Sequence, residues 1–124
     1  MNAEDIVKQA EAAYNTEDLD RIMSLFDQEI VFFWNGQKKA EGHGELRRWH
    51  EMWVGKQKDF TMRKTLRAAS GDTIAVEWQS RWIDPVSGEI NEGYGGEFWT
   101  MRNNRLREWR AYHTRYVQEP QRNA

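Results

Sequence analysis

Residues 90–117, with the sequence INEGYGGEFWTMRNNRLREWRAYHTRYV, decide the fold of this chain. The segment predicts two long strands joined at Asn103-Asn104, because aromatic residues favour strands and asparagine tolerates the positive φ of a tight turn. A hairpin of this length is not stable alone in water and needs further strands or a helical cover. It also carries polar side chains that are unusual for a core element, namely Glu97, Arg110 and His113.

The segments before the hairpin supply that cover. Apolar residues at helical spacing predict a helix over 4–14, a second helix that Thr16 caps, and a third over 42–55. A short apolar run predicts a buried strand over 30–34, which ends at a turn.

Beyond residue 59 the apolar period changes to two and predicts strands over 60–68 and 74–82, ahead of the long hairpin. Helices first and strands afterwards indicate an α+β fold, with three N-terminal helices packed on one face of an antiparallel sheet. We expect a single domain over 1–117 and a polar C-terminal tail over 118–124.

Composition excludes several classes of function. The net charge is −2 with both signs interspersed, which argues against a nucleic-acid partner. The chain has no cysteine, which excludes a disulfide framework and a thiol nucleophile. No apolar stretch is long enough to cross a membrane and the N-terminus lacks the layout of a signal peptide, so we expect a cytoplasmic protein without a membrane partner.

The chain contains seven tryptophans in 124 residues. Tryptophan combines a large apolar area with one N–H donor, so it suits ligand pockets that are partly polar. Trp34, Trp49 and Trp53, together with Tyr14, are candidates for the wall of such a pocket. Plain core packing is an equally good interpretation, because apolar pocket walls and cores share the same chemistry.

The order of elements and several local motifs resemble the nuclear transport factor 2-like superfamily. These motifs are NTEDLDRIMSLFDQEIVFFW at 15–34, Gly42-x-Gly44 at a helix start, and REWRAYH at 107–113. The superfamily includes SnoaL-like polyketide cyclases, ketosteroid isomerases and limonene epoxide hydrolases. The segment YGGEFW at 94–99 is most similar to an uncharacterised bacterial SnoaL-like branch.

This resemblance implies a cone-shaped, cystatin-like fold with a deep apolar pocket and a homodimer formed through the outer face of the sheet. It also implies which side chains face the pocket, namely Glu77, Gln79, Glu97, Trp99, Trp109 and His113. The outer face would then carry an apolar patch suited to an interface, made of Ile74, Val76, Trp78 and Trp82 with Tyr94 and Phe98.

The catalytic residues of the related enzymes are not found here. The positions of the isomerase carboxylates hold Phe33 and Trp99, and those of the epoxide hydrolase residues hold Glu77, Gln79 and Ala111. The resemblance therefore does not transfer either reaction to this chain.

Glu97 and His113 are the candidate catalytic pair. An imidazole titrates near neutrality, and a carboxylate beside it could orient it for proton transfer next to a carbonyl group. The alternative is a buried pair that only holds the sheet together, since buried polar groups need partners.

Lys64 interrupts an otherwise apolar strand face. An inward ammonium group would need Glu77 or Glu97 as its partner and could bind an oxyanion, with Gln79 as a second polar anchor. The alternative is that its stem passes Leu66 and the ammonium group reaches solvent.

The remaining histidines and the glycine pair do not indicate a metal site or another functional site. His43 and His50 lack a third ligand, so we expect solvated histidines and no metal. Gly95-Gly96 lies within a strand and indicates a bulge or bend.

Two functions remain open after these exclusions. The first is a small cofactor-free enzyme of the isomerase or cyclase type that acts on a hydrophobic, carbonyl-bearing molecule, with His113 as acid or base. The second is a non-catalytic module with the same fold, which binds a ligand or serves as a dimeric scaffold.

Overall fold

The computed structural model describes residues 1–118, which form three helices and six strands. The helices are α1 (Ala3–Thr16), α2 (Leu19–Met23) and α3 (His43–Glu51). The strands are β1 (Phe26–Trp34), β2 (Gln37–Glu41), β3 (Lys58–Ser70), β4 (Thr73–Ile83), β5 (Ile90–Arg102) and β6 (Arg105–Gln118). The predicted long hairpin is β5–β6, and both residues of its turn adopt positive φ, 52° at Asn103 and 62° at Asn104.

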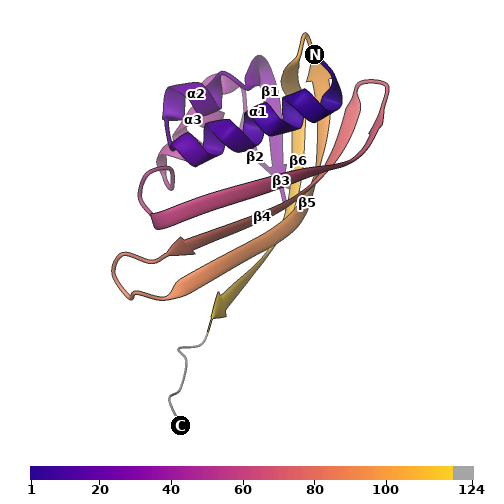
Figure 1. The fold of residues 1–124 in the computed structure, drawn as a ribbon. Helices are drawn as coiled ribbons and strands as arrows, with labels where there is room; N and C mark the ends of the chain where they lie inside the picture. The colour runs from indigo at the N-terminus through magenta and orange to yellow at the C-terminus, as the bar shows by residue number, and fades with distance from the viewer. Residues whose placement is uncertain (119–124) are drawn as a thin grey trace.

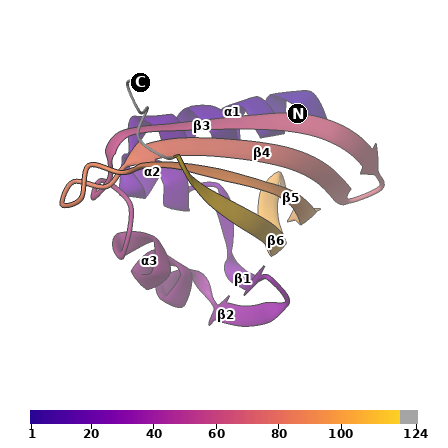
Figure 2. The same ribbon diagram turned by 90° about the horizontal axis from the view of Figure 1, so that it is seen from below.

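The strands form one curved sheet in the order β2-β1-β6-β5-β4-β3 (Figure 1). Strands β3 to β6 pair antiparallel with their neighbours in chain order, but β1 pairs parallel with β6. Figure 2 shows the sheet curving from β3 round to β2, with α2 and α3 inside the curve. The predicted α+β class is confirmed, with the correction that the sheet is mixed rather than antiparallel.

Two local features differ from the sequence-based expectation. The chain turns at Asn35-Gly36 into strand β2, which the sequence analysis did not predict. The second helix is a single short turn, and Asp18 rather than Thr16 caps it, because the Asp18 carboxylate accepts the N–H groups of Asp20 and Arg21. A carboxylate there also suits the positive end of the helix dipole.

Helix α1 protects the exposed edge of the sheet. The side chain of Asn15 bonds both the N–H and the C=O of Met62, at 2.8 and 2.7 Å, and the Glu11 carboxylate accepts the N–H of Lys64 at 2.8 Å. These groups belong to the edge strand β3, whose free backbone would otherwise offer a template for another strand. The same bonds hold α1 over the inner face of β3.

The pairing register decides which side chains share the inner face, because directly opposed residues of neighbouring strands point the same way. Lys64 lies opposite Trp78, Trp78 opposite Gly95, and Gly95 opposite His113. These four residues form one row across four strands on the inner face, which we call the transverse row. The inward orientation predicted for Glu97, Trp99, Trp109 and His113 agrees with this register.

The faces predicted for β4 were wrong. Ile74, Val76 and Trp78 are at most 4 % exposed and point inward, and Trp82 shares their face. Glu77 and Gln79 lie on the outer face, where the Glu77 carboxylate accepts hydrogen bonds from exposed Arg67. A strand has a side-chain period of two, so an offset of one residue exchanges its faces completely.

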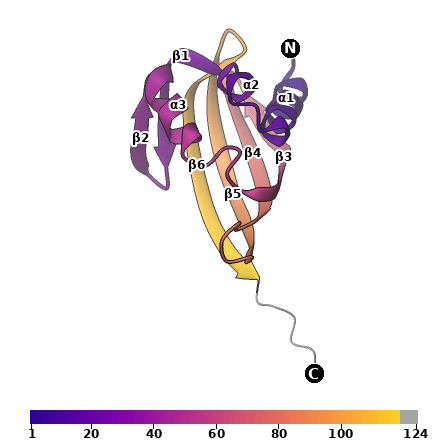
Figure 3. The same cartoon turned by 90° about the vertical axis from the view of Figure 1, so that its left-hand side faces the viewer.

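The core fills the closed end of the molecule. Its largest fully buried side chains come from both layers and are Trp99, Phe26, Phe32, Ile22, Met23, Ile30, Leu46, His50 and Val7. Figure 3 shows that β4, β5 and β6 extend beyond the helices at the other end. The predicted tail begins at Gln118, which is the last residue of β6, and its remaining residues, 119–124, lie outside the described part of the chain.

Candidate functional site

A cavity of about 210 Å³ opens between the inner face of the sheet and helices α1 and α3. Every tryptophan of the chain except Trp99 contributes to its wall. The complete lining consists of Tyr14, Trp34, Trp49, Trp53, Gln57, Phe60, Met62, Lys64, Trp78, Ser80, Trp82, Glu97, Trp109, His113 and Arg115. The cavity is thus aromatic, with a few polar groups at defined places.

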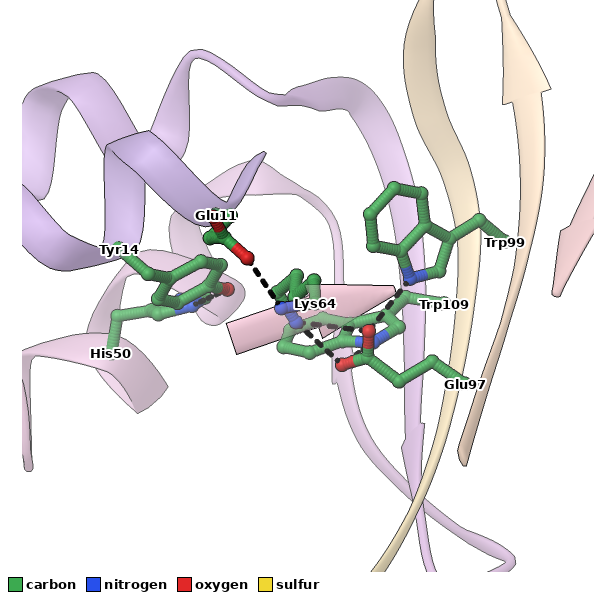
Figure 4. Close-up of polar contacts among 7 residues, drawn as sticks. All are labelled: Glu11, Tyr14, His50, Lys64, Glu97, Trp99 and Trp109. Carbon is green, nitrogen blue, oxygen red and sulfur yellow. Dashed lines mark hydrogen bonds and ion pairs between the residues drawn. The ribbon is translucent and has the colours of Figure 1, made fainter. Parts of the chain in front are cut away.

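A buried ion pair lies in the cavity wall. The ammonium nitrogen of Lys64 is 2.9 and 3.1 Å from the two carboxylate oxygens of Glu97, and both side chains are 2 % exposed (Figure 4). A buried charge is costly unless it is paired, so each residue requires the other. Lys64 therefore points inward to Glu97, and the alternative in which it reaches solvent was wrong.

Glu97 is the acceptor for two indole groups as well. The Nε1–H groups of Trp99 and Trp109 each donate to its carboxylate at 3.2 Å (Figure 4). Each carboxylate oxygen accepts one hydrogen bond from the ammonium group and one from an indole group. The carboxylate is therefore fully engaged by neighbouring donors. This arrangement explains why a carboxylate is tolerated in the aromatic interior.

The predicted hydrogen-bonded pair of Glu97 and His113 is absent from the described residues. Glu97 lies opposite Ala111, whereas His113 lies opposite Gly95, so the two side chains are separated by two residues along the strands, about 7 Å. Both nevertheless line the same cavity. Glu97 therefore pairs with Lys64, and within residues 1–118 His113 has no carboxylate partner.

Aromatic stacking holds His113 in place. Its ring lies parallel to Trp78, with centroids 5.3 Å apart and planes 2° apart, and 4.8 Å from the ring of Trp34. Its backbone N–H donates to the side chain of Asn35 at 2.8 Å. Partial burial, and secondarily the charge of Arg115, lower the pKa of His113 below its usual value of 6.5. The imidazole is therefore neutral near pH 7 and can accept a proton.

Gly95 makes this stacking possible. A Cβ atom at this position would lie 2.7 Å from Nε1 of Trp78 and 1.8 Å from the carbonyl oxygen of Tyr112. The indole thus packs directly on the backbone of β5 and reaches across it to His113. No register shift occurs at Gly95 or Gly96, so of the bulge or bend predicted there the bulge is absent.

Tyr14, which lines the cavity, forms a second polar pair with the buried His50 behind the cavity wall. The Tyr14 hydroxyl lies 2.8 Å from Nε2 of His50, and Nδ1 of the same ring lies 3.0 Å from the carbonyl oxygen of Leu46 (Figure 4). Burial lowers the pKa of His50 to about 4, so the ring is neutral at pH 7. Since a carbonyl only accepts, Nδ1–H donates to Leu46 and Nε2 accepts the hydroxyl proton of Tyr14.

This assignment has a consequence for Tyr14. Its single proton is already donated to His50, so the hydroxyl group is left as an acceptor towards a ligand. Burial, and secondarily the charge of Glu97, also raise the pKa of Tyr14 well above 10, which keeps the phenol protonated. Tyr14 is thus part of the wall rather than an acid that titrates.

Of the two histidines predicted to be solvated, His50 is not, and His43 is only partly exposed. His50 is fully buried, and the ring of His43 lies 2.9 Å from the carbonyl oxygen of Met23. The burial of His50 could have been predicted from the sequence. Leu46, His50 and Trp53 are spaced at i, i+4 and i+7, which places them on one face of the helix.

Two buried indole donors lack a partner within residues 1–118. They are the Nε1–H groups of Trp53 and Trp78, and both tryptophans line the cavity. An unpaired buried donor costs free energy, so such a wall favours a ligand that carries an acceptor, such as a carbonyl oxygen.

Part of the cavity wall was not predicted from the sequence. Trp78 and Trp82 were assigned to the outer face, and Gln57, Ser80 and Arg115 were not considered. Conversely, Glu77 and Gln79 are not in the cavity. The register of β4 against its neighbours decides the positions of Trp78, Ser80 and Trp82 and of Glu77 and Gln79.

Within residues 1–118, no group of three or more His, Asp or Glu side chains is arranged to hold a metal ion. In that same part of the chain, none of the helices has the length and apolar character that crossing a membrane requires.

A family model for the SnoaL-like domain matches residues 7–109. The chain belongs to the SnoaL-like family. Its cone of helices and curved sheet is the fold that the resemblance implied. No protein of curated function matches this SnoaL-like chain.

Solved structures with the same fold include an NTF2-like protein of unknown function from an Exiguobacterium species, with a TM-score of 0.74 and 16% identity over 88% of this chain and 98% of that one. They also include SalBIII, an epoxide hydrolase/cyclase-like enzyme of pyran ring formation in salinomycin, with a TM-score of 0.79 and 18% identity over 92% and 94% of the two chains. A third is a protein of ketosteroid isomerase-like fold from Catenulispora acidiphila in complex with trimethylamine, with a TM-score of 0.77 and 13% identity over 90% and 86%. At these identities the likeness is one of fold, and a fold hosts many chemistries.

Proposed function

We propose that this SnoaL-like protein binds a small hydrophobic carbonyl compound in the cavity and moves a proton on it without a cofactor. The observation that carries this proposal is the transverse row, in which an ammonium group and a neutral imidazole flank one indole. Lys64 Nζ lies 5.9 Å from the ring of Trp78, and the ring of His113 lies 5.3 Å from the same indole.

In this reaction Lys64 donates a hydrogen bond to the carbonyl oxygen of the ligand. His113 accepts a proton from the carbon next to that carbonyl, and the electrons of the C–H bond form an enolate whose oxygen faces the ammonium group. Return of the proton to the same or a conjugated carbon completes an exchange or an isomerisation. Glu97 holds the side-chain nitrogen of Lys64 in place through its two carboxylate oxygens.

The size of the cavity restricts the ligand. An apolar cavity of about 150 Å³ can hold benzene, whereas pockets for drug-sized molecules measure about 300–1,000 Å³. The 210 Å³ of this cavity fits a single ring with a short side chain. Large polycyclic substrates are too big for it unless the wall moves.

Proton exchange is the direct test. We expect the protein to catalyse exchange of the α-protons of phenylacetone in D2O, followed by NMR. His113→Ala should lower the exchange rate at least about 100-fold, in line with the usual contribution of a general base. Thr114→Ala is the matched control, because Thr114 is the next residue on β6 but is exposed on the outer face. Equal rates for wild type and His113→Ala would refute catalysis by this residue.

A non-catalytic binding protein is the second candidate. It is favoured by the full engagement of Glu97, which leaves no free carboxylate in the cavity wall. In that case phenylacetone would bind and raise the melting temperature, while its α-protons would exchange at the rate seen without protein.

We also propose that the protein forms a homodimer through the outer face of β5 and β6. Exposed aromatic side chains gather there in two edge-to-face pairs, Tyr94 with Tyr116 at 5.8 Å and Phe98 with Tyr112 at 6.3 Å. Exposed aromatic clusters of this kind are typical of interfaces. This set retains Tyr94 and Phe98 from the predicted patch and replaces Val76, Trp78 and Trp82, which lie on the inner face.

A further inference from the structure

Three polar groups meet at the open end of the cavity, around Gly93. A Cβ atom on Gly93 would lie 2.7 Å from the hydroxyl oxygen of Ser80 and 3.2 Å from Nε2 of His113. Arg115 lies directly opposite Gly93 on β6 and also lines the cavity. We call Ser80, His113 and Arg115 the mouth site.

The polar groups of the mouth site are free to bind a ligand. Ser80 is 7 % exposed and lines the cavity. The glycine leaves open the space above the strand that a side chain would fill, so the Ser80 hydroxyl group and Nε2 of His113 face the same gap. A hydroxyl group in this position can donate a hydrogen bond to an acceptor in the gap.

The charges of the cavity wall do not cancel. Lys64 and Glu97 neutralise each other, and the imidazoles of His50 and His113 are neutral near pH 7. Arg115 remains, and no residue of 1–118 forms an ion pair with it. The nearby carboxylate of Asp84 is engaged by the N–H groups of Val86 and Ser87 in its own loop. The wall therefore carries one uncompensated positive charge, at its mouth.

We infer that the ligand is a small aromatic oxo acid whose carboxylate binds Ser80 and Arg115 at the mouth while its carbonyl oxygen faces Lys64. This inference rests on the proposed function and adds the class of substrate and its orientation. The opposite orientation would place the carboxylate beside Glu97, where like charges repel in a buried environment. In the inferred orientation the acidic C–H group lies below His113, and the ring lies among the tryptophans.

Isothermal titration calorimetry with phenylpyruvate and phenylacetone tests the inference, because the two probes share the ring and the ketone and differ in the carboxylate. We expect wild type to bind phenylpyruvate at least about tenfold more tightly. Arg115→Gln should abolish this preference by weakening the binding of phenylpyruvate, and Arg115→Lys should retain most of it. Ser80→Ala should weaken binding of phenylpyruvate alone.

Arg81→Gln is the matched control, because Arg81 is an exposed cation on the outer face of β4 in the same sheet. A preference for phenylpyruvate that survives in Arg115→Gln, or equal binding of both probes to wild type, would overturn the inference and leave the proposed function intact. If neither probe bound and no proton exchange occurred, the proposed function would fall as well.

Discussion

The ion pair of Lys64 and Glu97 is the residue-level feature on which the cavity depends. Each charge is buried among indole rings, with Lys64 Nζ 5.7 Å from the ring of Trp99 and 5.1 Å from that of Tyr14. The desolvation cost of such a pair can cancel its Coulomb attraction, so its presence is poor evidence for a stabilising role. A role in function is the better explanation for keeping two charges in an aromatic interior.

Single and double substitutions of Lys64 and Glu97 distinguish two contributions to the free energy of unfolding. One is the cost of burying a charge without a partner, and the other is the net contribution of the ion pair. We expect Lys64→Met or Glu97→Leu to lower the free energy of unfolding by about 3–5 kcal/mol, because each leaves the partner buried and unpaired. The double variant should be more stable than either single one. Urea denaturation measures all three.

Arg67 and Glu77 provide the matched control, as an ion pair that joins β3 to the adjacent strand β4. They pair at 2.6 Å, but their side chains are 62% and 56% exposed. Disrupting such a pair should cost at most about 1 kcal/mol. An equal loss of unfolding free energy on disrupting the buried and the exposed ion pair would contradict the argument that burial sets the cost of breaking a pair.

His50 makes stability depend on pH. Its pKa falls from 6.5 to about 4 on folding, so the unfolded chain binds the proton more readily. Stability from this group is fully present above pH 6.5 and declines as the pH falls to about 4, by about 3 kcal/mol in total. Carboxyl groups with lowered pKa, such as Asp27 and Asp84, lose their contribution only at still lower pH.

We therefore expect the free energy of unfolding, measured by urea at pH 7, 6, 5 and 4.5, to fall steadily for wild type. His50→Gln should be less stable at pH 7 but show a much smaller decline over the same range. An unchanged slope in His50→Gln would assign the pH dependence to other groups.

At the scale of elements, the pairing of β4, β5 and β6 builds the site. The transverse row brings Lys64, Trp78 and His113 together although they are far apart in the sequence. Its centre is a glycine, because the indole of Trp78 occupies the space where a side chain of β5 would project.

Alanine substitutions at the two adjacent glycines give opposite predictions. Gly95→Ala places a methyl group 1.8 Å from a carbonyl oxygen and should cost about 3 kcal/mol or prevent folding. Gly96→Ala meets its nearest atom at 4.0 Å and should be neutral or stabilise by up to about 1 kcal/mol. Thermal denaturation followed by tryptophan fluorescence measures both, and similar effects at the two positions would refute the packing argument.

At the scale of the whole molecule, the cone has a packed closed end, an open end with the cavity, and an outer sheet face with exposed aromatics. Polar groups are concentrated where the cavity lies, while the closed end is almost purely apolar. Stability and ligand binding are therefore located at opposite ends of the same sheet.

The outer face predicts the oligomeric state. Phe98 is 50% exposed among other aromatics, and a symmetric interface would bring copies of the same side chains together. We expect wild type to sediment as a dimer and Phe98→Glu as a monomer, because like charges would meet in an apolar contact. Val86→Glu, at an isolated loop residue that is 95% exposed, should remain dimeric. A monomeric wild type at about 100 μM would exclude this dimer.

The helices, the long hairpin and the inner face of β3 could be predicted from the amino-acid sequence, because they follow from local periodicity and turn chemistry, which act over a few residues. The inner faces of β5 and β6 were implied by the resemblance to the nuclear transport factor 2-like superfamily, since alternation does not say which face of a strand is buried. The sequence also showed that an inward Lys64 must find a carboxylate, because a buried ammonium group cannot remain unpaired.

Only the tertiary structure decided which carboxylate that is, which face of β4 points inward, and that β1 lies parallel to β6. Each depends on how segments distant in the sequence align, and a shift of one residue in that alignment exchanges the two faces of a strand. For the same reason the predicted pair of Glu97 and His113 became two separate groups, with Glu97 bound to Lys64 and His113 stacked on Trp78.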